Sequence, residues 1–206
     1  MSTFSWTVAD AQQNMRYAYF SGAPGACASA GAWLVAGLVA INISAASAVV
    51  ALFVGGMLIF PVGVLLAKAC GRPGSHAGGN PLGILALEGT VLFVLCLPIA
   101  YAISQFRVQW FFPAMLLVIG GRYLTFSTLY GMRIYWACGA ALALTGCLLA
   151  ASNAAPSTSA FAGAAVEATF AAAIFVAARR EHAASSSTRP PWPTSAKGKR
   201  SPRPAE

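Results

Sequence analysis

Residues 110–136, WFFPAMLLVIGGRYLTFSTLYGMRIYW, decide the fold of this chain. The ten residues before Arg122 and the ten after it carry no charge. A membrane-spanning helix needs about 20 mostly apolar residues, so this stretch predicts a transmembrane helix with an arginine inside it. An arginine in hydrocarbon costs roughly 2.5–3.5 kcal/mol on insertion scales. The side chain of Arg122 is therefore expected to face protein or water.

The composition of the whole chain is that of an integral membrane protein. Hydrophobic residues make up 58% of the 206 residues and charged residues 9%, with a mean hydropathy of +0.68. A soluble domain is normally about a quarter charged. At about 20 residues a span, the length leaves room for some six or seven spans and for no separate soluble domain.

The apolar runs predict an all-α membrane protein, a polytopic bundle of six transmembrane helices. The expected spans are residues 19–41, 46–69, 82–104, 108–130, 134–151 and 160–178. Residues 1–18 form an amphipathic lead-in on the membrane surface, 19–180 the transmembrane domain and 181–206 a basic tail. The tail is rich in Ser, Pro and Lys/Arg, which predicts disorder and attraction to anionic lipid.

Small residues recur at four-residue spacing in the first and sixth spans. A smooth stripe of alanines lets a neighbouring membrane helix approach closely. The two predicted stripes are Ala28, Ala32, Ala36 and Ala40, and Ala160, Ala164, Ala168 and Ala172. In the second span, Pro61 follows Gly55 and Gly56 and predicts a bend.

The basic residues are distributed unequally over the two sides of such a bundle. With six spans both termini share one side, which holds eleven of the 13 Lys and Arg residues; the opposite side holds only Arg107. The positive-inside rule therefore predicts cytoplasmic termini. It also accounts for the net charge of +8 without a nucleic-acid partner. Tyr130, Tyr135 and Trp136 are expected at the inner interface.

Three ionisable residues lie well inside the predicted spans: Glu88, Arg122 and Glu167. At a rise of 1.5 Å per residue, they lie roughly 9, 12 and 16 Å from the cytoplasmic ends of their helices. We predict a Glu–Arg–Glu cluster that joins the third, fourth and sixth spans. Removal of one member of such a cluster should cost several kcal/mol. Tyr123 and Thr125, close to Arg122 in sequence, extend this polar site.

Two interpretations of the charge cluster stay open. It lines a polar pocket for a ligand or a proton, as in a small transporter, or it only holds the helices of a structural or assembly subunit together. A homo- or hetero-oligomer is compatible with either. Neither histidine lies in a span, the serines lack a G-x-S-x-G context and the five cysteines have no metal-ligand spacing. We therefore expect no enzyme, cofactor or metal.

Several short motifs resemble those of a bacterial family of small polytopic membrane proteins that is classed as a domain of unknown function. They are Asn80-Pro-Leu-Gly83, Leu85-Ala-Leu-Glu-Gly-Thr90, Trp110-Phe-Phe-Pro-Ala-Met115, Gly120-Gly-Arg-Tyr-Leu124 and Leu129-Tyr-Gly131. The likeness extends from about Asp10 to Ala178. It implies a helical protein of the bacterial inner membrane and brings no activity, ligand or catalytic residue with it.

Overall fold

The computed structural model describes residues 5–185, and every element in that part of the chain is helical. The elements are α1 (Val8–Tyr19), the 3₁₀ turn η1 (Phe20–Gly22), α2 (Ala23–Asn42), α3 (Ala45–Ala69), α4 (Leu82–Phe106), the 3₁₀ turn η2 (Val108–Trp110), α5 (Phe111–Tyr130), α6 (Ile134–Ala151) and α7 (Pro156–Ser185). Within residues 5–185, six helical segments are long and apolar enough to span a membrane. The predicted all-helical architecture with six helices of membrane-spanning length is confirmed.

Helix boundaries differ from the expected ones at both ends of the bundle. The first long helix begins only at Ala23, because η1 separates it from α1. The last helix continues to Ser185, past residue 181, where the predicted tail begins. The predicted disorder is therefore wrong for residues 181–185, and residues 186–206 lie outside the described part of the chain.

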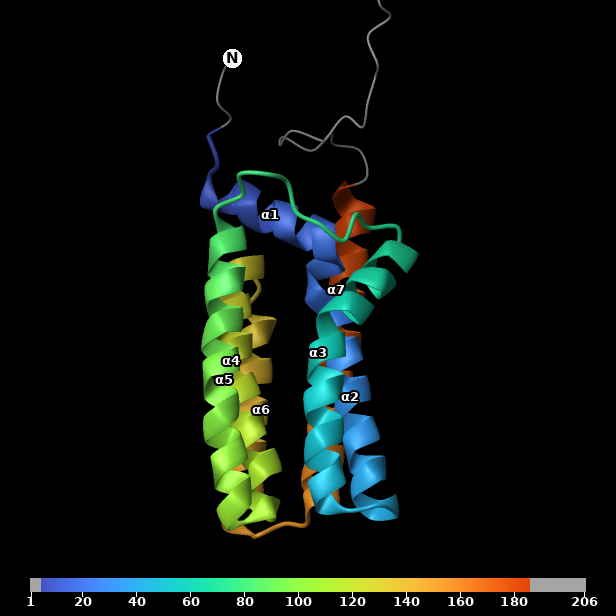
Figure 1. Cartoon of the computed structure of the whole chain (residues 1–206). Coiled ribbons are helices and arrows are strands. Elements are labelled where there is room, and N and C mark those ends of the chain that lie inside the picture. The colour runs from blue at the N-terminus through green and yellow to red at the C-terminus, as the bar shows by residue number, and fades with distance from the viewer. Residues whose placement is uncertain (1–4, 186–206) are drawn as a thin grey trace, which may run out of the picture.

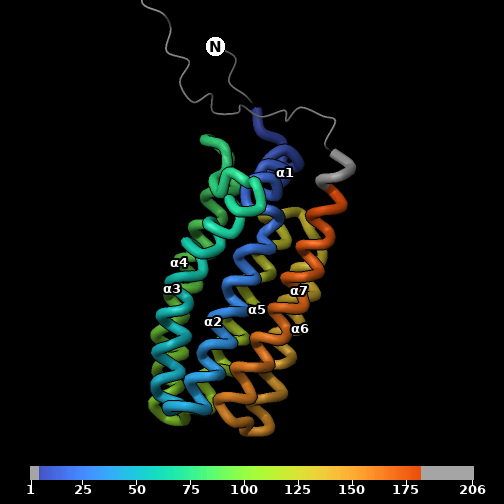
Figure 2. Tube along the Cα trace, turned by 90° about the vertical axis from the view of Figure 1, so that its right-hand side faces the viewer, coloured from blue at the N-terminus to red at the C-terminus, as the bar shows by residue number. Residues whose placement is uncertain are grey.

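The long helices form two groups of three that are separated in Figure 1. One group contains α2, α3 and α7, with α2 packed between the other two, and the second contains α4, α5 and α6. Contacts of α7 with α5 and α6 join the groups along one edge. Along the other edge α3 and α4 barely approach each other, although they follow one another in sequence. Figure 2 shows these two edges on opposite sides of the bundle.

Helix α3 contains Pro61 and stays helical through it. In Figure 1 the upper part of α3 turns away from α4. A proline inside a helix removes one backbone hydrogen bond and clashes with the preceding turn, so it accounts for this bend. The bend widens the separation between α3 and α4 toward the end of the bundle that carries α1.

Both alanine stripes are buried only in part, and Ala28 and Ala40 of the first are half-buried. On α2, Ala32 and Ala36 are buried, and a Cβ added at Gly55 of α3 would lie 2.7 Å from the Cβ of Ala32. On α7, Ala160 and Ala164 are buried, whereas Ala168 and Ala172 are exposed. A four-residue spacing drifts around a helix of 3.6 residues per turn. The buried face of α7 therefore continues through Glu167, Ala171 and Ile174.

Helix α1 lies across one end of the bundle, over both groups of helices (Figure 1). The chain turns from α1 into α2 through three residues with positive φ, namely Phe20, Ser21 and Gly22. Such a conformation is costly for residues other than glycine, so the surroundings must hold it in place. The hydroxyl of Tyr135 donates a hydrogen bond of 2.5 Å to the carbonyl of Ser21.

Tyr130 and Tyr135 are buried, at 6% and 0% exposure, and their rings stack at 5.4 Å. Both rings therefore pack inside the protein and do not face lipid as an aromatic belt would, and their depth at the inner interface stays a prediction. Trp136, by contrast, is 59% exposed. The two tyrosines support the turn between α1 and α2, a role that the aromatic-belt pattern does not distinguish from interfacial anchoring.

We expect Tyr135→Phe to lower the free energy of unfolding by about 1–3 kcal/mol, because the buried carbonyl of Ser21 loses its donor. Thermal unfolding of the detergent-purified protein, followed by circular dichroism, measures this loss. Tyr101→Phe is the matched control, since Tyr101 is 51% exposed and should leave the unfolding temperature unchanged. Equal unfolding temperatures for Tyr135→Phe and the wild type would contradict the role of this bond.

Candidate functional site

A cavity of about 480 Å³ lies between the two groups of helices. Side chains of α2, α3, α4 and α5 line it, and Met15 and Tyr19 of α1 contribute to its lining at the α1 end. Most of these side chains are aliphatic or aromatic. Arg122 is the one residue with a formal charge among them. Ligand sites in proteins are commonly mostly apolar pockets of about 300–1,000 Å³ with a few polar groups.

Arg122 projects from α5 toward α4. Its Nη2 donates a hydrogen bond of 3.2 Å to the hydroxyl of Thr90. The guanidinium carbon lies 4.9 Å from the ring centroid of Phe93 and 5.6 Å from that of Phe126. Each such cation–π contact contributes about 0.5–2 kcal/mol, the upper value applying to desolvated groups. These contacts stabilise the cation, and the guanidinium still lines the cavity.

The predicted Glu–Arg–Glu cluster is not formed. In residues 5–185 no ion pair joins Arg122 to Glu88 or Glu167. Glu88 is exposed on α4, and Thr90, which contacts Arg122, follows it by two residues. Two residues rotate a helix by about 200° at 3.6 residues per turn, so Glu88 points away from Arg122. The depths of Glu88 and Arg122 along their helices suit an ion pair, but the direction in which Glu88 points around α4 does not.

Glu167 lies on another side of the bundle, in a fully buried position at 0% exposure. Neither carboxylate oxygen has a hydrogen bond of good geometry within the described residues. The side chains of Ser29, Trp33 and Tyr123 lie close enough to interact with it. The indole N–H of Trp33 is also unpaired in this part of the chain, so a small movement would join the two groups. Glu167 thus sits behind three residues that line the cavity.

We expect Glu167→Gln to leave the free energy of unfolding unchanged or to raise it. An amide has the shape of the carboxylate and no charge, and the groups around it can bond to both of its polar atoms. If Glu167 formed an ion pair with Arg122, its removal would instead cost about 3–5 kcal/mol. Thermal unfolding measures the difference, with Glu88→Gln as the control at an exposed carboxylate. A large loss of stability in Glu167→Gln would contradict the present assignment.

The two remaining predicted site residues differ in their positions. Tyr123 is buried, lines the cavity and stacks on Tyr135 at 5.9 Å. Thr125 bonds to the carbonyl of Arg122 at 2.7 Å and packs near Gly89 of α4, and it does not line the cavity. A role of Glu88, Arg122, Glu167, Tyr123 and Thr125 in binding stays a prediction.

Sequence reasoning missed the aromatic partners of Arg122 and the contribution of α2 to the cavity. Phe126 follows Arg122 by four residues and therefore lies on the same face of α5, a spacing that predicts their contact. No comparable signal identifies Phe93, because its contact with Arg122 depends on how α4 packs against α5. The same holds for Ser29 and Trp33 of α2.

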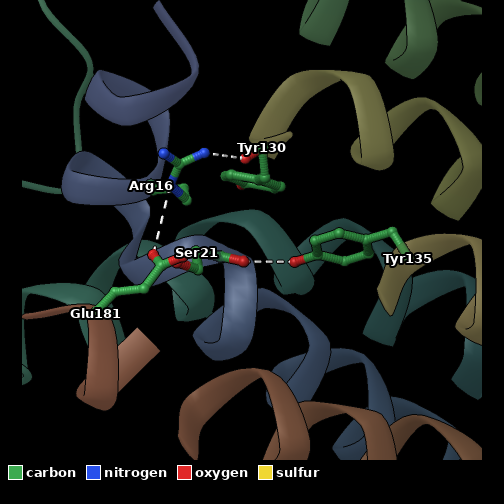
Figure 3. A network of polar contacts seen from close by, with 5 residues as sticks. All are labelled: Arg16, Ser21, Tyr130, Tyr135 and Glu181. Carbon is green, nitrogen blue, oxygen red and sulfur yellow. Dashed lines mark hydrogen bonds and ion pairs between the residues drawn. The ribbon is translucent and has the colours of Figure 1, made fainter. Parts of the chain in front are cut away.

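At the end of the cavity next to α1, polar contacts join α1 to the neighbouring helices (Figure 3). Arg16 Nη1 of α1 donates a hydrogen bond of 2.5 Å to the carbonyl of Tyr130, at the end of α5. Its Nε lies 3.5 Å from a carboxylate oxygen of Glu181 on α7. Helix α1 is thus bonded to both groups of helices. Beside it, the hydroxyl of Tyr19 lies 3.0 Å from Nδ1 of His76, in the loop between α3 and α4.

The chain from residue 8 to residue 177 matches the model of a family of unknown function (DUF7010). The chain belongs to this family. The match includes α1 and Arg122 and ends within α7. No curated protein and no solved structure matches the chain. Membership in DUF7010 therefore agrees with the predicted resemblance and assigns no activity.

Among the side chains of residues 5–181, no group of three or more His, Cys, Asp and Glu residues is placed to hold a metal ion. The cysteines in this part of the chain are free. The arrangement that the structure offers to a ligand is one guanidinium, one threonine hydroxyl and an apolar wall. Such a set of groups can bind and orient an anion.

Proposed function

We propose that the protein is a small transporter or ligand-binding protein of the membrane, with its site in the cavity around Arg122. One observation carries this proposal: the guanidinium of Arg122 lines a cavity and has no carboxylate partner among the described residues. An intramembrane charge is a functional candidate because its burial is costly. Had Arg122 been paired with two carboxylates, the structural interpretation would account for it fully.

Cysteine labelling tests whether the cavity can be reached. Arg122→Cys is made in a chain whose five native cysteines are replaced by alanine, and it is treated with a charged methanethiosulfonate and with N-ethylmaleimide. We expect modification of the folded protein. Reaction with the charged reagent indicates access from water, and reaction with the maleimide alone indicates access from the bilayer. Protection from both reagents until the protein is unfolded would contradict the proposal.

Leu142→Cys in the same background is the control. Leu142 is fully buried on α6 and does not line the cavity, so its thiol should stay protected in the folded protein. A reaction of Cys at this position would show that the whole bundle opens, and labelling at position 122 would then say nothing about a cavity.

A second candidate function is that of a non-catalytic structural or assembly subunit. The position of Glu88 favours it, because this carboxylate is exposed on α4. Helix α4 also has almost no buried residue apart from Ala100. A partner helix in a homo- or hetero-oligomer would cover this surface. Cross-linking through Glu88→Cys in membranes, with loss of an oligomer in Glu88→Leu, tests this candidate.

The location that we propose is the bacterial inner membrane, with both termini in the cytoplasm. The distribution of basic residues supports this orientation, since the loop between α4 and α5 has Arg107 as its only basic residue. The basic residues 186–206 would then lie near anionic lipid. Reporter fusions at residue 206 and in the α4–α5 loop test the orientation. We propose neither an enzymatic activity nor a cofactor.

A further inference from the structure

We propose that the ligand of the Arg122 cavity is a single-chain amphiphile with an anionic headgroup, and that it enters sideways from the bilayer between α3 and α4. The inference rests on the proposed function and names the class of molecule that the same site takes. Four features carry it: the opening, the apolar wall, the position of the cation and the volume.

The opening lies between α3 and α4. Met57 and Phe60 of α3 and Val94 of α4 all line the cavity, yet they are 78%, 70% and 52% exposed. A side chain that lines a cavity and is also exposed marks its mouth. A Cβ added at Gly56, another lining residue, meets no atom within 4 Å. Since α3 and α4 are long apolar helices, this mouth faces lipid tails.

The wall of the cavity beyond Arg122, on the side away from α1, is apolar. Leu52 and Phe53 of α3, Leu97 of α4 and Met115 of α5 line this part. Hydrocarbon buried there removes no polar group from water, so a hydrocarbon chain fits it. A compact polar solute would leave this part unfilled.

The headgroup position is set by Arg122 and Thr90. A guanidinium binds carboxylate and phosphate through paired N–H groups, and its contacts with Phe93 and Phe126 hold its plane. The hydroxyl of Thr90 adds a donor or acceptor beside it. No carboxylate of the described residues neutralises the cation, so an anionic ligand supplies the missing charge.

The volume of the cavity favours a ligand with one hydrocarbon chain over a ligand with two. At about 480 Å³ the cavity is in the lower half of the range for sites that hold one drug-sized molecule, roughly 300–1,000 Å³. A fatty acid and a lysophosphatidate share the required chemistry, namely one long chain and one anionic head. They differ in the headgroup, which the experiment distinguishes.

Quenching of Trp33 fluorescence by bromine tests the inference. Trp33 is fully buried and lines the cavity, so a brominated chain inside the cavity lies against its indole. The full chain is prepared with Trp33 as its single tryptophan, the other four being replaced by phenylalanine, and is titrated in micelles. The probes are 9,10-dibromostearate, its uncharged methyl ester and the lysophosphatidate with the same chain. We expect saturable quenching by the two anions and at least tenfold weaker binding of the ester.

Two variants, each with a matched control, test the headgroup contact and the opening independently. Arg122→Gln should bind acid and ester alike, whereas Arg107→Gln, at an exposed arginine, should keep the preference for the acid. Gly56→Phe should fill the mouth and remove quenching by all three probes. Gly31→Phe is its control, because a Cβ at Gly31 also meets nothing within 4 Å and Gly31 lies outside the cavity.

The outcomes distinguish this inference from the proposed function. Equal binding of acid and ester in the wild type, unchanged in Arg122→Gln, would overturn the anionic class while a reachable cavity remains. Absence of Trp33 quenching by any probe would overturn the inference, and labelling at position 122 would then decide whether the proposed function falls with it. A protein variant whose single tryptophan is Trp136 reports adsorption of the probes to the surface, because Trp136 is exposed on α6 and lies outside the cavity. The tighter of the two anions identifies the headgroup.

Discussion

Gly120→Ala is expected to destabilise the protein by about 1–3 kcal/mol, as overpacking of a tight core does, whereas Gly121→Ala should be neutral or slightly stabilising. A Cβ at Gly120 would lie 2.8 Å from the carbonyl oxygen of Gly139 and 3.2 Å from the amide nitrogen of Ala143. Both atoms belong to the backbone of α6, so the two helices must separate to make room. A Cβ at Gly121 meets nothing within 4 Å.

The neighbouring glycine is thus a matched control within one helix. Alanine is a better helix former than glycine by about 0.5–1 kcal/mol, and Gly121→Ala gains this term without a clash. Measured in the same detergent, the unfolding temperature should therefore fall in Gly120→Ala and stay unchanged or rise in Gly121→Ala. A similar shift in both would mean that α5 and α6 do not cross at Gly120 and Gly139. Gly139→Ala, whose Cβ would lie 2.7 Å from the carbonyl oxygen of Gly120, repeats the test from α6.

The sequence predicted the membrane class and the six long helices because both depend on local composition. An apolar run of about 20 residues and a proline or glycine near its end suffice to delimit a span. The depth of each charge along its helix also follows from counting residues. These properties need no knowledge of which helices become neighbours.

The partners of the charges could not be predicted, because they depend on rotation about each helix axis and on the order of the helices. Arg122 and Tyr123 are consecutive and so differ by about 100° around α5. Arg122 faces Thr90 on α4, and Tyr123 lies near Glu167 on α7. A hydrophobic stretch that is apolar all round gives little indication of its inward face. Residue counting therefore gives both acids a depth that suits a contact with Arg122, but it does not show that each lies on a side of its helix from which Arg122 is out of reach.

The grouping of the helices was also outside the reach of the sequence. Helix α7 packs against α2, and α4 joins α5 and α6 instead of α3. The α2–α7 pairing is non-local, and α4 packs on the helix that follows it instead of the one that precedes it, so no short-range pattern encodes the grouping. The cavity and its opening between α3 and α4 are direct consequences of this grouping.

Arg122→Glu is expected to abolish the binding of anionic amphiphiles and to lower the free energy of unfolding by about 2 kcal/mol or more. Insertion scales give arginine and acidic residues similar costs at the centre of a membrane helix, so the charge itself is not the difference. The difference is in the surroundings: the faces of Phe93 and Phe126 carry negative quadrupole charge, which attracts a guanidinium and repels a carboxylate. Two contacts that stabilised the wild type become unfavourable.

Second-site changes make this prediction specific to the structure. An acid–arginine cluster would allow Glu88→Arg or Glu167→Arg to restore stability in Arg122→Glu by reversing the pair. The structure predicts that neither change restores stability. Glu88 points away from α5, and Glu167 lies behind Ser29, Trp33 and Tyr123. Arg122→Lys should keep part of the stability, since an ammonium also binds to aromatic faces, although it cannot pair with a carboxylate through two N–H groups. Rescue by either reversal, measured by unfolding temperature, would mean that the carboxylates reach Arg122 and that the cavity has no unpaired cation to offer a ligand.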